Sequence, residues 1–258
     1  MAIRINHIFR YPVKSLTAEK LSKTQLECGR SITNDRRFGL LLDSSAVNVS
    51  TSNWMPKTEF LSLMRNERLA ALETQFDDTT NILTILHQSR KAARGKLTDH
   101  NGRTEIEKYF ADYLGDEIAR RPKIIESAGN HAFSDHKSPV LSILNLASVK
   151  DLEKSTLSPI SPMRFRANLW LEGLAPWEEF NWLGYDIKIN NATLSVTERI
   201  DRCAATNVNP DTAKRDLNIV KALQKNFKHV DMGVFARVST GGIIRVGDEV
   251  LPKSPTTA

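Results

Sequence analysis

Cys203 is the residue of this chain whose neighbours most clearly suggest chemistry. Arg199 and Arg202 lie within four positions of its thiol. Nearby guanidinium charge favours the thiolate, the form of cysteine that binds metals or attacks electrophiles. Asn209 and Pro210 follow soon after, so we expect Cys203 to lie at a strand end, in a connection ordered by a proline turn. A half-buried structural cysteine is the alternative, and the local pattern leaves both interpretations open.

A second group of polar residues lies far from Cys203 in the sequence. Lys14 and Ser15 follow the first expected strand, and Asp35, Arg36 and Arg37 precede the second. Cationic and hydroxyl side chains at strand ends are suited to hold a phosphate, because they supply both charge and hydrogen-bond donors. For any one of these residues alone, a solvated turn is the simpler interpretation.

A third group alternates arginine with an aromatic residue just before an apolar run. Arg164 and Arg166 flank Phe165, and residues 169–171 read Leu-Trp-Leu. In a strand, this spacing would place both guanidinium groups on one face of the sheet.

Other polar residues are expected to be structural or solvent-exposed. The six histidines show no spacing typical of a zinc site. Glu178 and Glu179 are expected in a solvated turn, and Cys28 is expected to be a small packed residue. The basic residues between positions 90 and 96 predict a solvated loop, with docking of an acidic electron donor as the alternative.

The composition limits the class of protein. The chain has 258 residues, of which 40% are hydrophobic and 26% charged, with a net charge of +6. These values are typical of a soluble globular protein. The sequence lacks the ~20 consecutive apolar residues of a membrane-spanning helix and the residue order of a secretory signal. Two cysteines are too few for a disulfide scaffold, and we expect a cytoplasmic protein.

Most of the elements that must position these side chains are strands. Asn190-Asn191 and Gly241-Gly242 predict the turns of two hairpins, at residues 185–196 and 234–246, because Asn and Gly tolerate positive φ. Apolar stretches of strand length occur at residues 2–9, 38–42, 82–86, 140–144, 185–189, 193–196, 234–238 and 243–246.

Helical periodicity appears in three places, at residues 104–114, 146–152 and 217–227. Thr104 and Glu107 have the spacing of a capping box at the start of the first helix. The predicted fold class is therefore mainly β with a few helices (α+β), arranged as two β-barrel-like units. We place the boundary between Gly115 and Ala132, where Gly, Pro and charged residues cluster, and expect residues 255–258 to be a frayed tail.

Together these motifs resemble the MOSC domain family of molybdenum-cofactor-binding proteins, which includes the mitochondrial amidoxime-reducing component and bacterial relatives. The resemblance spans nearly the whole chain, and the shared order of the motifs makes it specific. The segments that carry it are YPVKS at residues 11–15, DRRF at 35–38, FSD at 133–135, RFRANL at 164–169, EG at 172–173, PWE at 176–178, RCAATNVNP at 202–210 and RVGD at 245–248.

The resemblance implies a fold and a set of site residues. Residues 1–120 would form the MOSC N-terminal β-barrel domain, and residues 121–258 a MOSC-type barrel. Cys203 would be the catalytic metal ligand, bound to the molybdenum of the cofactor. The phosphate and pterin portions of the cofactor would be held by Lys14, Ser15, Arg36, Arg166 and Arg202, with Ser138 nearby. Ala167 stands where the family usually has Pro, and Phe38 where it commonly has Trp; we expect both changes to affect packing.

The resemblance also implies an activity, the reduction of N-hydroxylated small molecules. The four cysteines of the [2Fe-2S] domain found in some relatives are missing from the sequence. We therefore expect electrons from a separate flavin or iron–sulfur protein, and neither a nucleic-acid nor a membrane partner. Pyridoxal phosphate binding is a further association of the family. One alternative is a non-catalytic carrier of the molybdenum cofactor; another, resting only on basic charge and β content, is a nucleic-acid-binding barrel.

Overall fold

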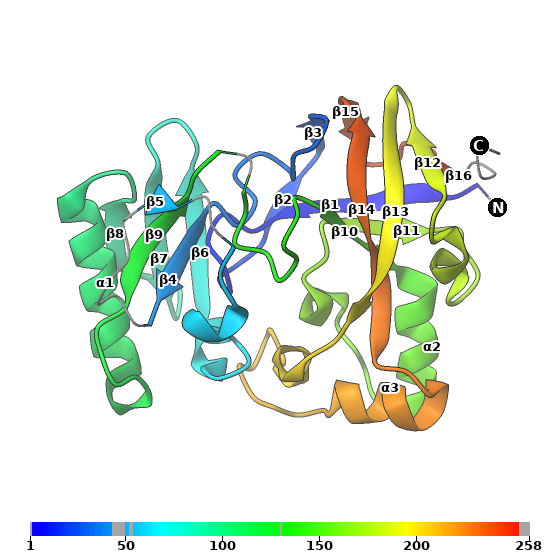
Figure 1. Ribbon diagram of the computed structural model, residues 1–258. Helices are drawn as coiled ribbons and strands as arrows, with labels where there is room; N and C mark the ends of the chain where they lie inside the picture. The colour runs from blue at the N-terminus through cyan, green and yellow to red at the C-terminus, as the bar shows by residue number, and fades with distance from the viewer. Residues whose placement is uncertain (1, 43–49, 52–53, 130, 253–258) are drawn as a thin grey trace.

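The computed structural model describes residues 2–42, 50–51, 54–129 and 131–252. Within these residues, strands and three α-helices form two lobes that lie side by side (Figure 1). The prediction of a mainly β fold with a few helices is confirmed. The helices are α1 (His100–Leu114), α2 (Leu146–Thr156) and α3 (Ile219–Phe227). The strands are β1 (Arg4–Arg10), β2 (Glu19–Leu21), β3 (Lys23–Leu26), β4 (Phe38–Leu41), β5 (Ser50–Thr51), β6 (Leu72–Asp77), β7 (Ile82–His87), β8 (Arg90–Lys96), β9 (Lys123–Ser127), β10 (Leu141–Asn145), β11 (Leu169–Glu172), β12 (Asp186–Ile189), β13 (Ala192–Asp201), β14 (Asp231–Thr240), β15 (Gly242–Arg245) and β16 (Leu251–Pro252).

An eight-stranded sheet forms the larger lobe, in the order β16-β12-β13-β14-β10-β11-β1-β2. Neighbouring strands are antiparallel, except that β10 and β11 are parallel. Alternation along each strand sorts the side chains onto two faces. In β11, Leu169 and Leu171 pack into the core enclosed by the sheet, whereas Trp170 packs on the other face with α2 and α3 residues such as Leu152 and Leu223.

The smaller lobe contains β4 to β9 and α1. Strands β6, β7 and β8 form an antiparallel meander, and β9 lies between β4 and β5. Helix α1 lies against this lobe and buries Ile106, Phe110 and Leu114 in its core.

The first three strands belong to the larger lobe, although they open the chain. Strand β1 pairs with β11 and β2, and β3 pairs with β15. Ile5, Ile8 and Leu26 share a core with residues of the C-terminal half. The segments that follow β1 and precede β4 therefore lie where the two lobes meet. The predicted domain division after residue 120 stays a prediction.

One predicted hairpin is confirmed and the other is wrong. Strands β12 and β13 pair antiparallel around Asn190, whose φ is 53°. Strand β15 does not fold back on β14 but pairs with β3, with Gly242 opposite Leu26. A Cβ on Gly241 would lie 2.7 Å from the Leu26 carbonyl oxygen. Gly241 therefore permits a close approach to β3, and Gly242 permits one to Ala192 of β13, whose amide nitrogen would lie 2.8 Å from a Cβ at Gly242.

Helix α1 begins earlier than predicted, at His100. The Asp99 side chain caps it by accepting a hydrogen bond from the Gly102 amide at 2.7 Å. Glu107 takes no part in a capping box, because its buried carboxylate accepts a hydrogen bond from the Ile124 amide at 3.0 Å.

The basic residues expected in a loop form strand β8, and α3 begins at Ile219. The predicted tail at 255–258 lies outside the described residues.

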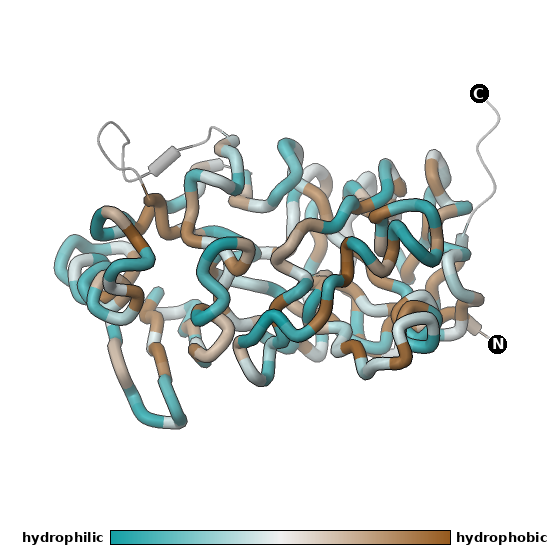
Figure 2. The backbone as a smooth tube through the Cα atoms, turned by 90° about the horizontal axis from the view of Figure 1, so that it is seen from below, coloured by the Kyte–Doolittle hydropathy of each residue, from teal (hydrophilic) through white to brown (hydrophobic). Residues whose placement is uncertain are grey.

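Apolar residues are spread over the whole body of the molecule in short segments (Figure 2). In the described part of the chain, no helix combines the length and apolar composition that crossing a bilayer requires.

Gly233 in β14 offers a test of strand packing. Its φ is 77°, and a Cβ at this position would lie 2.3 Å from the Ile143 carbonyl oxygen of β10. We expect Gly233→Ala to lower the free energy of unfolding by about 3 kcal/mol, because backbone strain and a steric clash add. Gly247→Ala is the control: φ there is 90° with nothing within 4 Å, so only strain of about 1 kcal/mol is expected. Urea denaturation measures both, and equal losses would contradict the close packing.

Candidate functional site

A cavity of about 360 Å³, the Cys203 cavity, lies where the two lobes meet. Its wall combines residues of the smaller lobe, such as Lys57 and Ser62, with residues of the larger lobe, such as Phe235. Most of the predicted site residues, although distant in sequence, line this one cavity: Lys14, Ser15, Arg36, Arg166, Arg202 and Cys203.

Ser138 is the predicted site residue that is absent from the described lining. Its hydroxyl oxygen accepts a hydrogen bond from Arg237 at 3.2 Å. Ser134 and Asp135, from the same connection, line the cavity instead. A family motif indicated this segment, but the sequence could not show which of its side chains face inward.

Cys203 lies two residues after the end of β13, close to a strand end as predicted. It precedes a short 3₁₀ helix at Ala204–Asn207, and its carbonyl oxygen accepts hydrogen bonds from the Thr206 amide (3.1 Å) and hydroxyl (2.9 Å). The neighbouring Arg202 guanidinium donates to the carbonyl oxygens of Met232 (2.8 Å) and Phe165 (3.0 Å). These bonds fix the backbone on both sides of a half-buried thiol.

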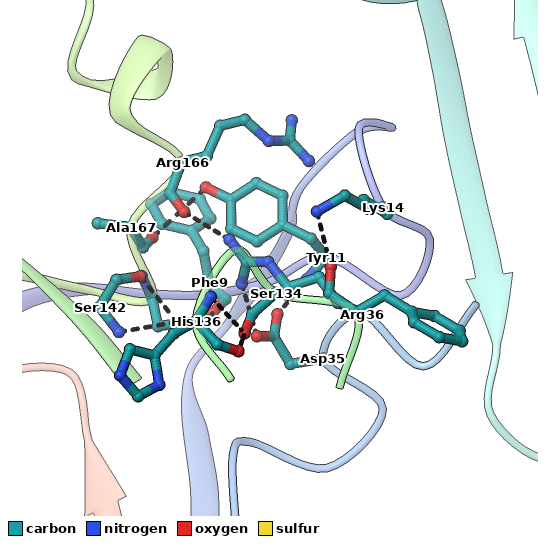
Figure 3. A network of polar contacts seen from close by, with 12 residues as sticks. Phe9, Tyr11, Lys14, Asp35, Arg36, Ser134, His136, Ser142, Arg166 and Ala167 are labelled. Atoms are coloured by element: carbon teal, nitrogen blue, oxygen red, sulfur yellow. Dashed lines mark hydrogen bonds and ion pairs between the residues drawn. The ribbon is translucent and has the colours of Figure 1, made fainter. Parts of the chain in front are cut away.

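Tyr11 and Asp35 organise Arg36 and Arg166 (Figure 3). The buried Asp35 carboxylate accepts hydrogen bonds from the Tyr11 amide at 2.8 Å and from Arg36 at 2.5 Å. Arg36 also donates to the Arg166 carbonyl oxygen at 2.8 Å. The Arg36 and Arg166 guanidinium carbons lie 4.4 and 4.3 Å from the centroid of the Tyr11 ring, a distance at which cations are attracted to aromatic rings. The N-terminal segment thus positions an arginine of the C-terminal half.

Lys14 is buried at the edge of this network. Its ammonium group donates to the Phe133 carbonyl oxygen at 2.8 Å and pairs with Asp135 at 2.6 Å. Burial lowers the pKa of Lys14, and the Asp135 carboxylate offsets only part of this effect. Burial alone would raise the pKa of Asp135, but the charge and hydrogen bond of Lys14, together with the charges of Lys57 and Arg36, outweigh burial and lower it.

Arg166 and Arg202 have no carboxylate partner among the described residues. Their guanidinium groups are held by backbone carbonyl oxygens, with Arg166 donating to Leu16 at 2.8 Å. Burial lowers the pKa of both arginines to about 10. Because charged groups are costly to bury without a counter-ion, these two cations favour an anionic ligand in the cavity.

Three of the lining residues adopt left-handed backbone conformations that are uncommon for side chains other than glycine. Ser15 has φ 69°, Arg36 has φ 49° and Arg166 has φ 51°. Such strain concentrates at functional sites, where the surrounding hydrogen bonds enforce it. Nothing in the sequence signalled it, since Ser and Arg are not typical of this region.

The structure corrects the predicted arrangement of Arg164 and Arg166. They do not lie in a strand: Arg164 belongs to a 3₁₀ helix at Pro162–Phe165, and Arg166 ends it. Both still line the Cys203 cavity. Arg164 is buried and pairs with Asp216 at 2.6 Å, which ties this helix to the connection after Cys203.

Two further predictions about polar residues are wrong. Glu179 is not in a solvated turn but is fully buried, and accepts hydrogen bonds from Asn145 (2.7 Å) and Ser148 (2.8 Å). Burial raises its pKa. Cys28 is exposed, with its thiol 3.2 Å from the Ser239 carbonyl oxygen.

Comparison with known protein families covers most of the chain. The model described as "MOSC N-terminal beta barrel domain" matches residues 2–117, and the model described as "MOSC domain" matches residues 128–251. The chain belongs to the MOSC domain family. The resemblance identified from the motifs is thereby confirmed.

Curated relatives of this MOSC protein include enzymes named for the molybdenum cofactor. The molybdenum cofactor sulfurase of Caenorhabditis elegans is 24% identical over 241 residues, covering 90% of this chain and 33% of the relative. That of Caenorhabditis briggsae is 22% identical, with 95% and 35% covered. The mitochondrial amidoxime-reducing component 1 of Mus musculus is 26% identical, with 55% and 44% covered. The chain spans about a third of the length of the two sulfurases.

Solved structures with a similar arrangement include two bacterial proteins. The YuaD protein of Bacillus subtilis aligns with 98% of this chain and 96% of its own, at a TM-score of 0.44 and 12% identity. YiiM of Escherichia coli aligns with 46% of this chain and 56% of its own, at a TM-score of 0.35 and 18% identity.

The buried ion pair of Asp35 with Arg36 should be required for stability. We expect Asp35→Ala to lower the free energy of unfolding by about 3 kcal/mol, because it leaves the Tyr11 amide and the guanidinium without their acceptor. Asp78→Ala is the matched control, since Asp78 pairs with Arg10 at 2.7 Å but its side chain is 43% exposed; a loss of at most about 1 kcal/mol is expected. Chemical denaturation compares the two variants, and an equal small loss would argue against the Asp35 network.

Ser15 tests whether backbone strain is retained at the site. Ser15→Gly and Ser15→Ala both remove the hydroxyl, but only glycine relieves the positive φ. We expect Ser15→Gly to be more stable than Ser15→Ala by about 1 kcal/mol. At Ser155 in α2 the order should reverse, because glycine is the poorer helix former. Thermal unfolding of the four variants gives the comparison, and the same order at both positions would disprove the strain.

Proposed function

We propose that this protein holds the molybdenum cofactor in the Cys203 cavity and reduces N-hydroxylated compounds with electrons from a separate flavin or iron–sulfur protein. The observation that carries the proposal is a thiol beside half-buried cations that have no carboxylate partner among the described residues. Arg166 and Arg202 are the two cations, and both line the cavity with Cys203.

The residues present fit a cofactor with a soft metal centre and a phosphate. A thiolate is the protein ligand that such a metal prefers, and Cys203 would supply it. Lys14, Ser15 and Arg36 would hold the phosphate and pterin portions together with Arg166 and Arg202. A dianionic phosphate would offset the cost of burying these cations. For Ser138, a role near the cofactor rests on the family motif alone.

The residues of this chain bind, orient and shield the reacting groups. The basic wall attracts the anionic cofactor, and the hydrogen bonds around Arg202 and Thr206 hold the Cys203 backbone in one position. When bound, the molybdenum centre supplies the two-electron chemistry that the protein side chains lack. The overall reaction consumes two electrons and two protons, breaks the N–O bond and releases the oxygen as water.

A second candidate function is storage or transfer of the cofactor without turnover. The observation that favours it is the short span of the match to the sulfurases, about a third of their length. A binding module shared with longer enzymes would have the same cavity and the same basic wall.

A turnover assay on the wild type and on a Cys203 variant distinguishes the reductase from the carrier. In protein loaded with cofactor and supplied with a chemical reductant, we expect the wild type to reduce a model hydroxylamine and Cys203→Ala to lose at least about 100-fold in kcat, the size of effect typical for losing one essential group. Cys28→Ala, the exposed cysteine elsewhere in the chain, is the matched control and should keep wild-type activity.

The outcomes differ between the two functions. Full activity in Cys203→Ala would overturn the assignment of the thiol. A carrier would show no turnover in any variant, and would instead release its cofactor to an apo-enzyme.

A further inference from the structure

A second cavity, of about 280 Å³, adjoins the Cys203 cavity and has a more apolar lining. It lies beside a short 3₁₀ helix at Glu67–Ala71. Whereas charged and polar side chains dominate the wall of the Cys203 cavity, the lining here is mostly apolar. Representative residues are Leu16, Leu63, Leu69, Ala70, Met163 and Val208.

The two cavities share part of their walls. Ser15, Leu63, Arg164, Arg166 and Ala205 line both. Ala205 follows Cys203 by two positions, so the boundary between the cavities lies close to the proposed metal ligand. A ligand held across this boundary would meet apolar surface at one end and the thiol and cations at the other.

Arg215 holds the two sides of this boundary together. Its guanidinium donates to the Ala204 carbonyl oxygen at 3.1 Å and to the Met64 carbonyl oxygen at 2.9 Å, and it pairs with Glu67 at 3.1 Å. The connection after Cys203 is thereby fastened to the smaller lobe. The apolar cavity is therefore formed in advance, which lowers the entropic cost of binding.

We propose that the apolar cavity is the subsite for the body of the substrate, an aryl or compact alkyl group whose N-hydroxyl end lies in the Cys203 cavity. This inference rests on the proposed function and names the class of substrate. The size of the cavity is sufficient, because an apolar protein cavity of about 150 Å³ binds benzene. Transfer of the apolar group out of water drives its binding.

Two hydroxamic acids with the same polar end test the proposal. Benzohydroxamate carries a phenyl group where acetohydroxamate carries a methyl group. On the protein without cofactor, ligand-observed NMR titration should show the phenyl compound binding on the order of tenfold more tightly. On the loaded enzyme, KM should show the same preference.

Variants that fill the apolar cavity should remove this preference. Ala70 lines the cavity and is half-buried, so Ala70→Phe should bring both Kd and KM for benzohydroxamate close to those for acetohydroxamate. Ala18→Phe fills the same cavity from another segment, and serves if the first variant does not fold. Ala111→Phe in α1 lines neither cavity and is the matched control, which should keep the wild-type preference.

The results separate the subsite from the reaction. Equal binding of the two hydroxamates to the wild type, or an unchanged preference in both cavity-filling variants, would overturn the subsite. Loss of benzohydroxamate binding on cofactor loading would also overturn it, because the cofactor would then occupy the cavity. If the preference depends on Ala70 but neither hydroxamate is reduced by the loaded protein, the reductase assignment fails and the aryl subsite stands.

Discussion

The structure around Cys203 depends on half-buried positive charge that has no equal amount of negative charge beside it among the described residues. Arg166 and Arg202 are held by carbonyl oxygens of Leu16, Met232 and Phe165. Carbonyl dipoles satisfy the N–H donors, but they do not neutralise the charge, and burial lowers the pKa of both groups to about 10. The remaining imbalance favours an anion in the cavity, so the folded protein sacrifices stability for a binding site.

The fold supplies the means to hold these cations in place. The opening strand β1 is inserted beside β11, so the segment after it reaches the C-terminal half of the chain. There, the Tyr11 ring faces both Arg36 and Arg166, and burial raises the pKa of Tyr11 to about 12, which keeps the phenol neutral. Asp35 fixes Arg36 from the other side, and burial and this carboxylate have opposite effects on the guanidinium, with the net pKa raised. Neither half of the chain could form this site alone.

The sequence was informative where the signal is local. Cys203, the adjacent Arg202 and the Lys14-Ser15 pair after the first strand proved to line one cavity. The Asn190 turn was also predicted correctly, because the preference of Asn for positive φ is a property of that residue.

By contrast, the pairing of β15 with β3 joins strands more than 200 positions apart in the sequence. The pair Gly241-Gly242 is compatible both with a turn and with a close contact between strands. Glu179 was misjudged for a similar reason, since its partners Asn145 and Ser148 lie on another element. The apolar cavity left no recognisable pattern, because its lining comes from several separate segments.

We infer that Cys203 and the half-buried arginines Arg166 and Arg202 together form a molybdenum-cofactor site. The most direct measurement is elemental analysis combined with pterin fluorescence on protein purified from a host that makes the cofactor, comparing the wild type with Cys203→Ala. We expect molybdenum and pterin near one per chain in the wild type, and loss of the metal in the variant. Wild-type protein without either component, or a variant that keeps its molybdenum, would contradict it.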